Sequence, residues 1–300
     1  MSNFTSWISA ARLRTLPLSI SGIIVGSSIA AHTGYFDIAI FSLALGTTLG
    51  LQILSNFAND YGDGVKGTDN EDRIGPARAI QSGLITQKEM KMGMVITAVC
   101  TLFLAILLIY ASFSSEQLLS ALIFFLLGVA AIVAAIKYTV GNSAYGYRGM
   151  GDIFVFIFFG LVAVYGSYYL YSHDHEIISI FPAISIGLLS VAVLNLNNLR
   201  DRISDKKANK ITLVVKLGEK KAKTYHYILI FGALFCFLIY SVITALDLND
   251  FIYVLAFIPL IFHLLRVGNN KDPKLLDPEL KIVALSTFGI SLLFALGLIW

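Results

Sequence analysis

The chain has 300 residues, of which 57% are apolar and only 14% are charged. Soluble domains carry about 25% charged residues, so this composition excludes an ordinary soluble domain and favours an all-α membrane protein. The net charge of +3 gives no basis for a nucleic-acid partner. Both cysteines lie within apolar runs, which argues against a disulfide framework or a cysteine metal site.

Residues 1–15 contain Trp7 followed by Arg12 and Arg14, and this order predicts an interfacial helix rather than a cleaved signal peptide. Apolar runs then follow one another, each close to the length of about 20 residues that a membrane span requires. They predict one domain over residues 1–300, with nine transmembrane helices in a single bundle. The predicted spans are 16–33, 37–59, 90–113, 117–136, 151–171, 177–199, 224–246, 251–267 and 281–300. The eighth is the shortest and contains Pro259.

The basic residues test this number of spans. If the N-terminus and the loops after the even-numbered spans share one side, all 22 Lys and Arg residues fall on that side. The loops on the opposite side carry none. Because basic residues are retained on the cytoplasmic side, the N-terminus is predicted to be cytoplasmic and the C-terminus to lie outside. The long hydrophilic loops 60–89 and 200–223 place the expected active site on the cytoplasmic side.

Two acidic clusters lie at the cytoplasmic ends of the second and sixth predicted spans. If each helix continues past its apolar run, the members of a cluster share one face. The first cluster comprises Asn56, Asn59, Asp60 and Asp63, and the second comprises Asn198, Asp201 and Asp205. Carboxylates are unfavourable near a helix C-terminus, and clustering adds repulsion between like charges. A bound cation would remove both penalties, so the clusters predict a cation site.

The ligand types indicate which cation is expected. Carboxylate and amide oxygens, without a His or Cys cluster, suit Mg²⁺ or Ca²⁺ rather than Zn²⁺, and Mg²⁺ commonly binds a few carboxylates together with substrate phosphates. Three basic residues that follow the first cluster are expected to hold phosphate: Lys66, Arg73 and Arg78. A metal-bound diphosphate beside an apolar bundle indicates a lipid diphosphate. When such a lipid loses its diphosphate it leaves an allylic cation, which aromatic side chains around the site could stabilise.

The pattern Asn59-Asp60-x-x-Asp63 followed by Asp69, and the pattern Asp201-x-x-x-Asp205, resemble the two acidic motifs of the UbiA superfamily of intramembrane prenyltransferases. The superfamily pattern would place the last acid of the first motif at residue 67, whereas here that acid is at residue 69. This spacing resembles one branch of the superfamily. That branch is the 1,4-dihydroxy-2-naphthoate polyprenyltransferases of menaquinone synthesis. Other segments that resemble it are 11–17, 75–83, 146–156 and 197–201. The loop 140–144 departs from the family, which usually has Gly and Pro residues there.

The resemblance implies transfer of a polyprenyl chain from an all-trans polyprenyl diphosphate to 1,4-dihydroxy-2-naphthoate in a bacterial inner membrane. Diphosphate and CO₂ would be released and demethylmenaquinone formed. The Mg²⁺ ligands implied are Asn59, Asp60, Asp63, Asp201 and Asp205. Asn56 and Asn198 would help to bind the metal diphosphate, while Lys66 and Arg78 would hold phosphate. Tyr147 and Arg148 would lie near the acceptor, and Asp69 would be a further metal ligand or an acceptor-side base.

Three alternatives are weighed against this interpretation. CDP-alcohol phosphatidyltransferases need an Ala-Arg pair soon after an Asp-Gly, whereas here Asp63-Gly64 is followed by Val65, Lys66 and Gly67. A secondary transporter would place its acids near the bilayer midplane rather than at the rim. Prenylation of another aromatic acceptor, such as 4-hydroxybenzoate, stays open.

Overall fold

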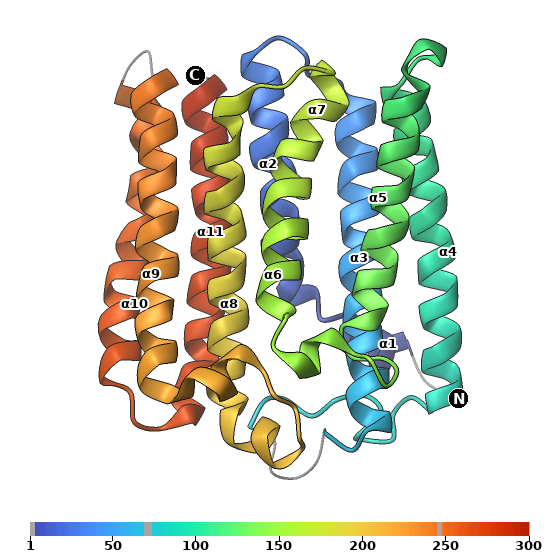
Figure 1. Cartoon of the computed structure of the whole chain (residues 1–300), viewed down its shortest axis with the longest axis vertical. Coiled ribbons are helices and arrows are strands. Elements are labelled where there is room, and N and C mark those ends of the chain that lie inside the picture. Colours follow the sequence, from blue (N-terminus) through green and yellow to red (C-terminus); the bar gives the residue numbers. More distant parts are fainter. Residues whose placement is uncertain (1–3, 69–73, 245–247, 300) are drawn as a thin grey trace.

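The computed structural model describes residues 4–68, 74–244 and 248–299, and the regular elements in these ranges are all helical. Within them, nine helical segments are long and apolar enough to cross a membrane. They form one bundle, and the N-terminus lies at the end that carries the longer connections (Figure 1). The predicted all-α fold with nine membrane-capable helices is confirmed.

A short helix, α1 (Phe4–Ala11), precedes the bundle, and the chain turns at Arg12, which has a φ of 50°. The fifth span contains a π-helical stretch between α6 and α7. The helices of the spans are α2 (Leu16–His32), α3 (Ile38–Val65), α4 (Gln87–Ser112), α5 (Leu118–Lys137), α6 (Gly151–Val155), the π-helix (Phe156–Gly166), α7 (Ser167–Ser172), α8 (Ile180–Lys207), α9 (Leu213–Thr244), α10 (Ile258–Asn269) and α11 (Asp277–Ile299).

Local sequence signals set several helix starts. Asp37 caps α3 by accepting hydrogen bonds from the amides of Ala39 and Ile40, at 2.7 and 3.1 Å. Thr86 and Glu89 form a capping box at α4. Pro259 lies in the first turn of α10, where the missing amide hydrogen breaks no helical hydrogen bond. The proline is therefore compatible with a helix in the eighth predicted span.

Several helices extend beyond the predicted spans. The second and sixth spans were predicted to end at 59 and 199, but α3 continues to Val65 and α8 to Lys207. The chain before residue 224 is helical as well, with a break at Gly218. Hydropathy detects the apolar part of a helix, whereas hydrogen bonding carries the helix on into polar sequence. The extensions keep both acidic clusters on helices.

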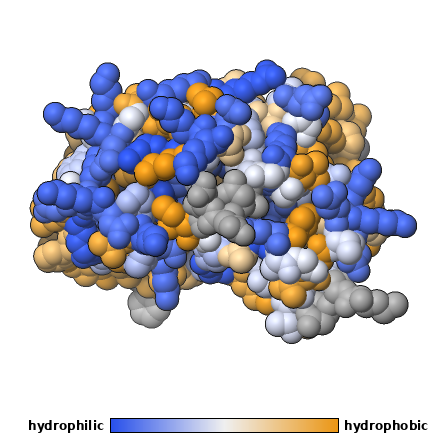
Figure 2. All heavy atoms as spheres, turned by 90° about the horizontal axis from the view of Figure 1, so that it is seen from below, coloured by the Kyte–Doolittle hydropathy of each residue, from blue (hydrophilic) through white to orange (hydrophobic). Residues whose placement is uncertain are grey.

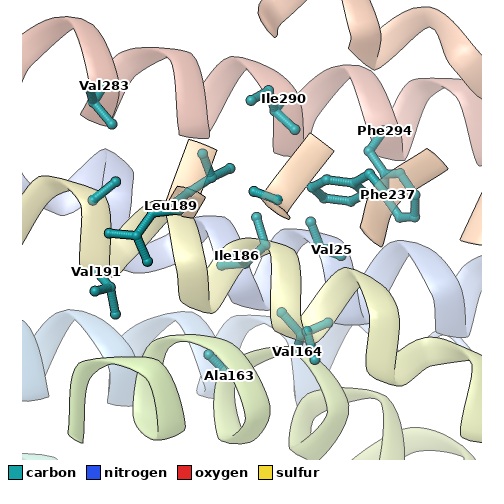
Figure 3. Packing of buried hydrophobic residues seen from close by; sticks show 14 of the residues in the cluster. Val25, Ala163, Val164, Ile186, Leu189, Val191, Phe237, Val283, Ile290 and Phe294 are labelled. Atoms are coloured by element: carbon teal, nitrogen blue, oxygen red, sulfur yellow. The ribbon is translucent and has the colours of Figure 1, made fainter. Parts of the chain in front are cut away.

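The bundle is built around α8. Its core residues Ile186 and Leu189 pack among Val25 of α2, Phe237 of α9 and Ile290 of α11 (Figure 3). In contrast, Ala134 is the one buried residue of α5. Close approach of α2 to the π-helical stretch requires a glycine, because a Cβ on Gly22 would lie 2.6 Å from the Cβ of Ala163.

A buried polar chain links α9, α10 and α11. His226 Nε2 lies 2.8 Å from His263 Nε2, and His263 Nδ1 lies 2.6 Å from Glu279 Oε2. Arg266 donates to the same glutamate. Each member other than Arg266 is buried. The chain therefore fixes the start of α11 against α10 through hydrogen bonds as well as apolar packing.

Hydrophilic residues cover most of the end that carries the longer connections (Figure 2). The short helix α1 lies at this end, and its Trp7 packs edge-on against Phe57 of α3 with ring centroids 5.3 Å apart. Because α3 and α8 also end here, this face of the bundle holds both acidic clusters.

Candidate active site

The two acid-bearing helices end in the same way. At the end of α3, Gly67 has a φ of 68°, and the amide of Thr68 donates to the carbonyl of Asp63 at 3.0 Å. At the end of α8, Asn209 has a φ of 56°, and the amide of Lys210 donates to the carbonyl of Asp205 at 2.8 Å. Both are Schellman motifs, in which the chain reverses over the last turn. Each reversal brings the following segment back beside the last acid of its cluster.

The first cluster is covered by the segment that follows α3. Asp60 and Asp63 are only 1% and 2% exposed. Asp60 Oδ2 accepts from the amide of Ala79 at 3.2 Å, and Arg78 Nη2 lies 3.4 Å from Asp63 Oδ2. Tyr147 donates its hydroxyl to Asp63 Oδ1 at 2.7 Å. The predicted phosphate ligand Arg78 therefore lies within the first cluster.

The second cluster is neutralised by neighbouring cations. Arg200 donates to both carboxylate oxygens of Asp201, at 2.9 and 2.6 Å. It also contacts Asp277, at the start of α11. Asp205 Oδ1 lies 3.6 Å from Lys210 Nζ. Buried carboxylates need such partners, because an uncompensated charge is strongly unfavourable away from water.

Lys210 joins the two clusters. Its ammonium lies 3.7 Å from Asp63 Oδ2 and 3.6 Å from Asp205 Oδ1, so acids of α3 and α8 meet at one cation. Burial alone would lower the pKa of Lys210, but the two carboxylates outweigh burial and raise it. Lys210 is therefore charged at neutral pH and reduces the repulsion between the clusters.

A small cavity of about 10 Å³ lies between the clusters, close to the volume of one water. Its walls are Asp63, Thr68, Arg78, Asn197, Asp201, Ser204, Asp205 and Lys210. Asp205 Oδ2 is buried without a hydrogen-bond partner, as is Asp60 Oδ1, which lies on the wall of the neighbouring large cavity with Arg12 Nη2 at 3.9 Å. Buried polar atoms are nearly always satisfied, so these oxygens point to a missing partner. A hard divalent cation suits this set of oxygens.

In the structure, the ammonium of Lys210 bridges the two acidic clusters. Across the described ranges, no group of three or more His, Cys, Asp or Glu side chains is spaced to hold a metal ion. Lys210 and Arg200 contact carboxylate oxygens of Asp63, Asp201 and Asp205 instead. A divalent cation therefore fits by chemistry, provided that Lys210 moves toward a bound anion.

Lys66 lies at the edge of the same site. Its ammonium donates to the carbonyl of Thr139 at 2.7 Å and lies 3.9 Å from the centre of the Tyr147 ring. Burial lowers the pKa of Lys66, although Asp63 acts in the opposite direction. Burial, together with the charge of Asp63, raises the pKa of Tyr147, so its phenol stays protonated and donates to that carboxylate.

A cavity of about 1020 Å³ extends from the first cluster into the bundle. Along α3 it is lined from Asp63 back to Ala44, which corresponds to roughly 28 Å of helix. One wall is polar and includes Gln52, Asn56 and Asn59, and the opposite walls of α4, α5 and the π-helical stretch are almost entirely apolar. Such a cavity can hold a long apolar chain whose polar head lies among the acids.

The predicted site residues differ in whether they line the two cavities. Asn59 and Asn56 both line the large cavity, and the Asn56 side-chain amide also donates to the carbonyl of Ala11 at 2.8 Å. Asn198 is buried but lines neither cavity, and Asn197 takes that place. Arg148 is exposed and lines neither cavity. The predicted residues Asp69 and Arg73 lie outside the described ranges.

Sequence reasoning missed Lys210, Asn197, Arg12 and Asp277. Lys210 is one of nine basic residues in the loop 200–223, so charge alone could not single it out. The signal was Asn209, because Asn favours the left-handed residue that closes a Schellman motif. Arg12 Nη2 lies 3.9 Å from Asp60 Oδ1, and only the turn at residue 12 brings it there.

Buried acids from two helices, flanked by cations at the polar end of an apolar cavity, define an intramembrane enzyme that acts on a lipid with an anionic head group. The chain belongs to the UbiA prenyltransferase family, whose model matches residues 19–297. The predicted resemblance is thereby confirmed.

Two bacterial relatives are similar over nearly the whole chain. The 1,4-dihydroxy-2-naphthoate octaprenyltransferase of Haemophilus influenzae is 45% identical over 295 residues, which covers 98% of this chain and 95% of the relative. The Escherichia coli protein of the same name is 43% identical over 298 residues, covering 99% and 96%.

Solved structures agree on the fold. The apo structure of a UbiA homolog from Aeropyrum pernix aligns with a TM-score of 0.69 at 15% identity, covering 96% of this chain and 98% of that one. A UbiA homolog from Archaeoglobus fulgidus bound to DMAPP and Mg²⁺ aligns with a TM-score of 0.61 at 16% identity, covering 94% and 98%.

Proposed function

We propose that this protein transfers a polyprenyl chain from an all-trans polyprenyl diphosphate to 1,4-dihydroxy-2-naphthoate, with loss of diphosphate and CO₂, to give demethylmenaquinone in its reduced, quinol form. The names of the two bacterial relatives support the acceptor and the reaction. The observation that carries the proposal is the meeting of Asp63 of α3 and Asp205 of α8 around Lys210, at the polar end of an apolar cavity.

The diphosphate binds among the cations of the site. Arg78, Lys210 and Lys66 all lie within reach of the first cluster. Mg²⁺ held by Asn59, Asp60, Asp63, Asp201 and Asp205 would stabilise the departing diphosphate. The Mg²⁺ and DMAPP bound by the Archaeoglobus fulgidus homolog support this part. When the anion enters, Lys210 turns from the carboxylates to a phosphate oxygen, so charge stays balanced.

The polyprenyl chain lies along the apolar walls. Phe124 of α5 and Phe158 of the π-helical stretch line this part of the cavity, and Tyr138 and Tyr145 line its mouth. Burial raises the pKa of Tyr138, with Asp152 as the next contribution, so its phenol is neutral. Aromatic faces there stabilise the allylic cation that forms as the carbon–oxygen bond breaks.

The acceptor enters beside the first cluster, near Tyr147. Its hydroxyl bridges Asp63 and Thr68, at 2.7 and 2.6 Å, so it fixes the carboxylate nearest the acceptor. The exposed Arg148 stands outside the cavity mouth and attracts an anionic aromatic acid rather than holding it.

The orientation follows from charge. The N-terminus and the loops that carry the basic residues share one end of the bundle (Figure 1). The site therefore faces the cytoplasm, the C-terminus faces outward, and the protein is embedded in the bacterial inner membrane. Residues 1–300 act as one domain, with α1 at the membrane interface.

The test is to incubate purified protein in lipid with Mg²⁺, an all-trans polyprenyl diphosphate and a panel of aromatic acids, and to identify the product by mass. The expected product is the decarboxylated prenyl naphthoquinol. A prenylated 4-hydroxybenzoate in place of that product would move the assignment to the alternative acceptor. Movement of substrate across proteoliposomes without any product would favour a transporter.

A further inference from the structure

Arg200 lies between two carboxylates at the edge of the large cavity. Its Nε and Nη2 bind Asp201, and its Nη1 donates to Asp277 Oδ1 at 2.5 Å. Nη2 also donates to Asn197 at 2.9 Å. The arginine side chain is 2% exposed, so these partners rather than water stabilise its charge.

Asp201 faces both Arg200 and the small acidic cavity. A divalent cation in that cavity would compete with the guanidinium for the same carboxylate charge. If Asp201 turned to the cation and Arg200 had no other acid, a buried positive charge would be left uncompensated. Asp277 removes this difficulty, because it already holds a third nitrogen of the same guanidinium.

We propose that Asp277 is a positioning residue of the active site, which takes up the charge of Arg200 when Asp201 turns to a divalent cation. The inference rests on the proposed function, since it requires the divalent cation. Asp277 itself stays on the cavity wall and contacts Arg200. It acts on the cation through Arg200 and Asp201.

The start of α11 is fixed so that Asp277 can do this. Residues two positions apart on a helix point about 200° apart, so Glu279 faces away from the cavity. Arg266 and His263 of α10 bind that glutamate. The first turn of α11 is thus bound on both sides, by α8 through Asp277 and by α10 through Glu279.

An acid at a helix start is common, because it is stabilised by the helix dipole. That explanation accounts for an acidic residue at position 277 but not for its partner, a buried arginine 77 residues away in the chain. Asp277 does not line the small acidic cavity but contacts Arg200, so a role as a direct ligand is not needed to explain its place.

The chain offers a matched control. Glu219 Oε2 lies 2.8 Å from Nη2 of Arg202, which is on α8 like Arg200. Its side chain is 42% exposed, against 39% for Asp277. Glu219 lies on α9 and lines neither cavity. Glu219→Gln therefore removes the same kind of acid from an arginine of α8, without touching the site.

The experiment measures Mn²⁺ binding to the purified full chain in lipid by electron paramagnetic resonance, with Mn²⁺ replacing Mg²⁺. Asp277→Asn should weaken Mn²⁺ binding by about 10–100-fold, the range typical when the hydrogen-bonded groups behind a metal ligand are disturbed. The Mg²⁺ concentration for half-maximal turnover should rise in parallel, with kcat at saturating Mg²⁺ retained. Glu219→Gln should leave the Mn²⁺ affinity within about twofold of that of the unmodified protein. Asp277→Glu keeps the carboxylate and should retain most of the Mn²⁺ affinity that Asp277→Asn loses.

Equal Mn²⁺ affinity in Asp277→Asn and the unmodified protein would overturn the inference, as would equal weakening by Glu219→Gln. In an Arg200→Gln background, Asp277→Asn should have no further effect beyond about twofold, because the residue it acts through is gone. Additional weakening there would also overturn it. If the unmodified protein bound no Mn²⁺ at all, the metal part of the proposed function would fail instead, and the two failures are therefore distinguishable.

Discussion

Replacing Lys210 with Met tests the ion bridge between the clusters. The ammonium lies 3.7 Å from Asp63 Oδ2 and 3.6 Å from Asp205 Oδ1. At an effective dielectric constant of about 20, each attraction is worth about 4 kcal/mol, from which the desolvation of the buried ammonium must be subtracted. Removing one partner of a buried ion pair leaves uncompensated charge and typically destabilises by about 3–5 kcal/mol. Without divalent cations, Lys210→Met should be destabilised by that amount.

The assay is thermal unfolding of the purified protein in detergent, with EDTA and with Mg²⁺. A loss of about 3 kcal/mol corresponds to a fall in Tm on the order of 5–10 °C. Mg²⁺ should recover most of it, because the cation neutralises the same carboxylates, and Mn²⁺ should bind at least about tenfold more tightly than to the unmodified protein. Turnover should nevertheless fall, since a diphosphate contact is lost.

The exposed Lys221 belongs to the same basic segment 200–223, on the first part of α9, and serves as the control. Lys221→Met should change neither Tm nor Mn²⁺ affinity. If Lys210→Met in EDTA unfolded at the temperature of the unmodified protein, the bridge would not bear on stability. If Mg²⁺ then stabilised both proteins equally, the assignment of the cation to these carboxylates would be refuted.

Three further results are expected. Asp60→Ala or Asp201→Ala should abolish turnover while the protein still inserts into the membrane, and excess EDTA should abolish turnover of the unmodified protein. Full activity in either variant or in EDTA, measured by product mass, would exclude the metal role. Gly62→Ala should destabilise the inner rim by about 1–3 kcal/mol and slow turnover, because a Cβ there would lie 2.7 Å from the backbone carbon of Thr139; Gly46→Ala, which meets only a leucine methyl at 3.4 Å, is the control for a Tm comparison. Tyr147→Phe removes a hydrogen bond to a carboxylate, worth about 1.5–3 kcal/mol, so kcat should fall by about 10–100-fold with the protein still folded, and an unchanged kcat would show that Asp63 needs no such support.

Much of the membrane architecture could be read from the sequence. Runs of apolar residues and the one-sided distribution of Lys and Arg led to nine spans, and the structure has nine membrane-capable helices among its described residues. The ends of the second and sixth spans were predicted too early. Hydropathy falls where the sequence becomes polar, whereas the backbone hydrogen bonds of the helix continue into the polar residues. The convergence of the two acidic helix ends was expected, and Lys210 holds them together.

The choice between neighbouring asparagines could not be made from periodicity. Asn197 and Asn198 both lie within about 80° of Asp201 and Asp205 on a helical wheel, so either fits the same face. Only the packing of α8 against its neighbours decides that Asn197 reaches the cavities. Contacts made across the bundle, such as that of Arg200 with Asp277, depend in the same way on tertiary structure.

The meeting of α3, α8 and α11 also sets the moment in synthesis at which the protein can work. Asp63 leaves the ribosome early, whereas its partner Lys210 and the first turn of α11 come much later. At roughly 5–20 residues per second, the interval is on the order of ten seconds or more. A nascent chain in the membrane thus carries its first acids without the groups that complete them, and it gains a competent reaction centre only when the last helix has been inserted.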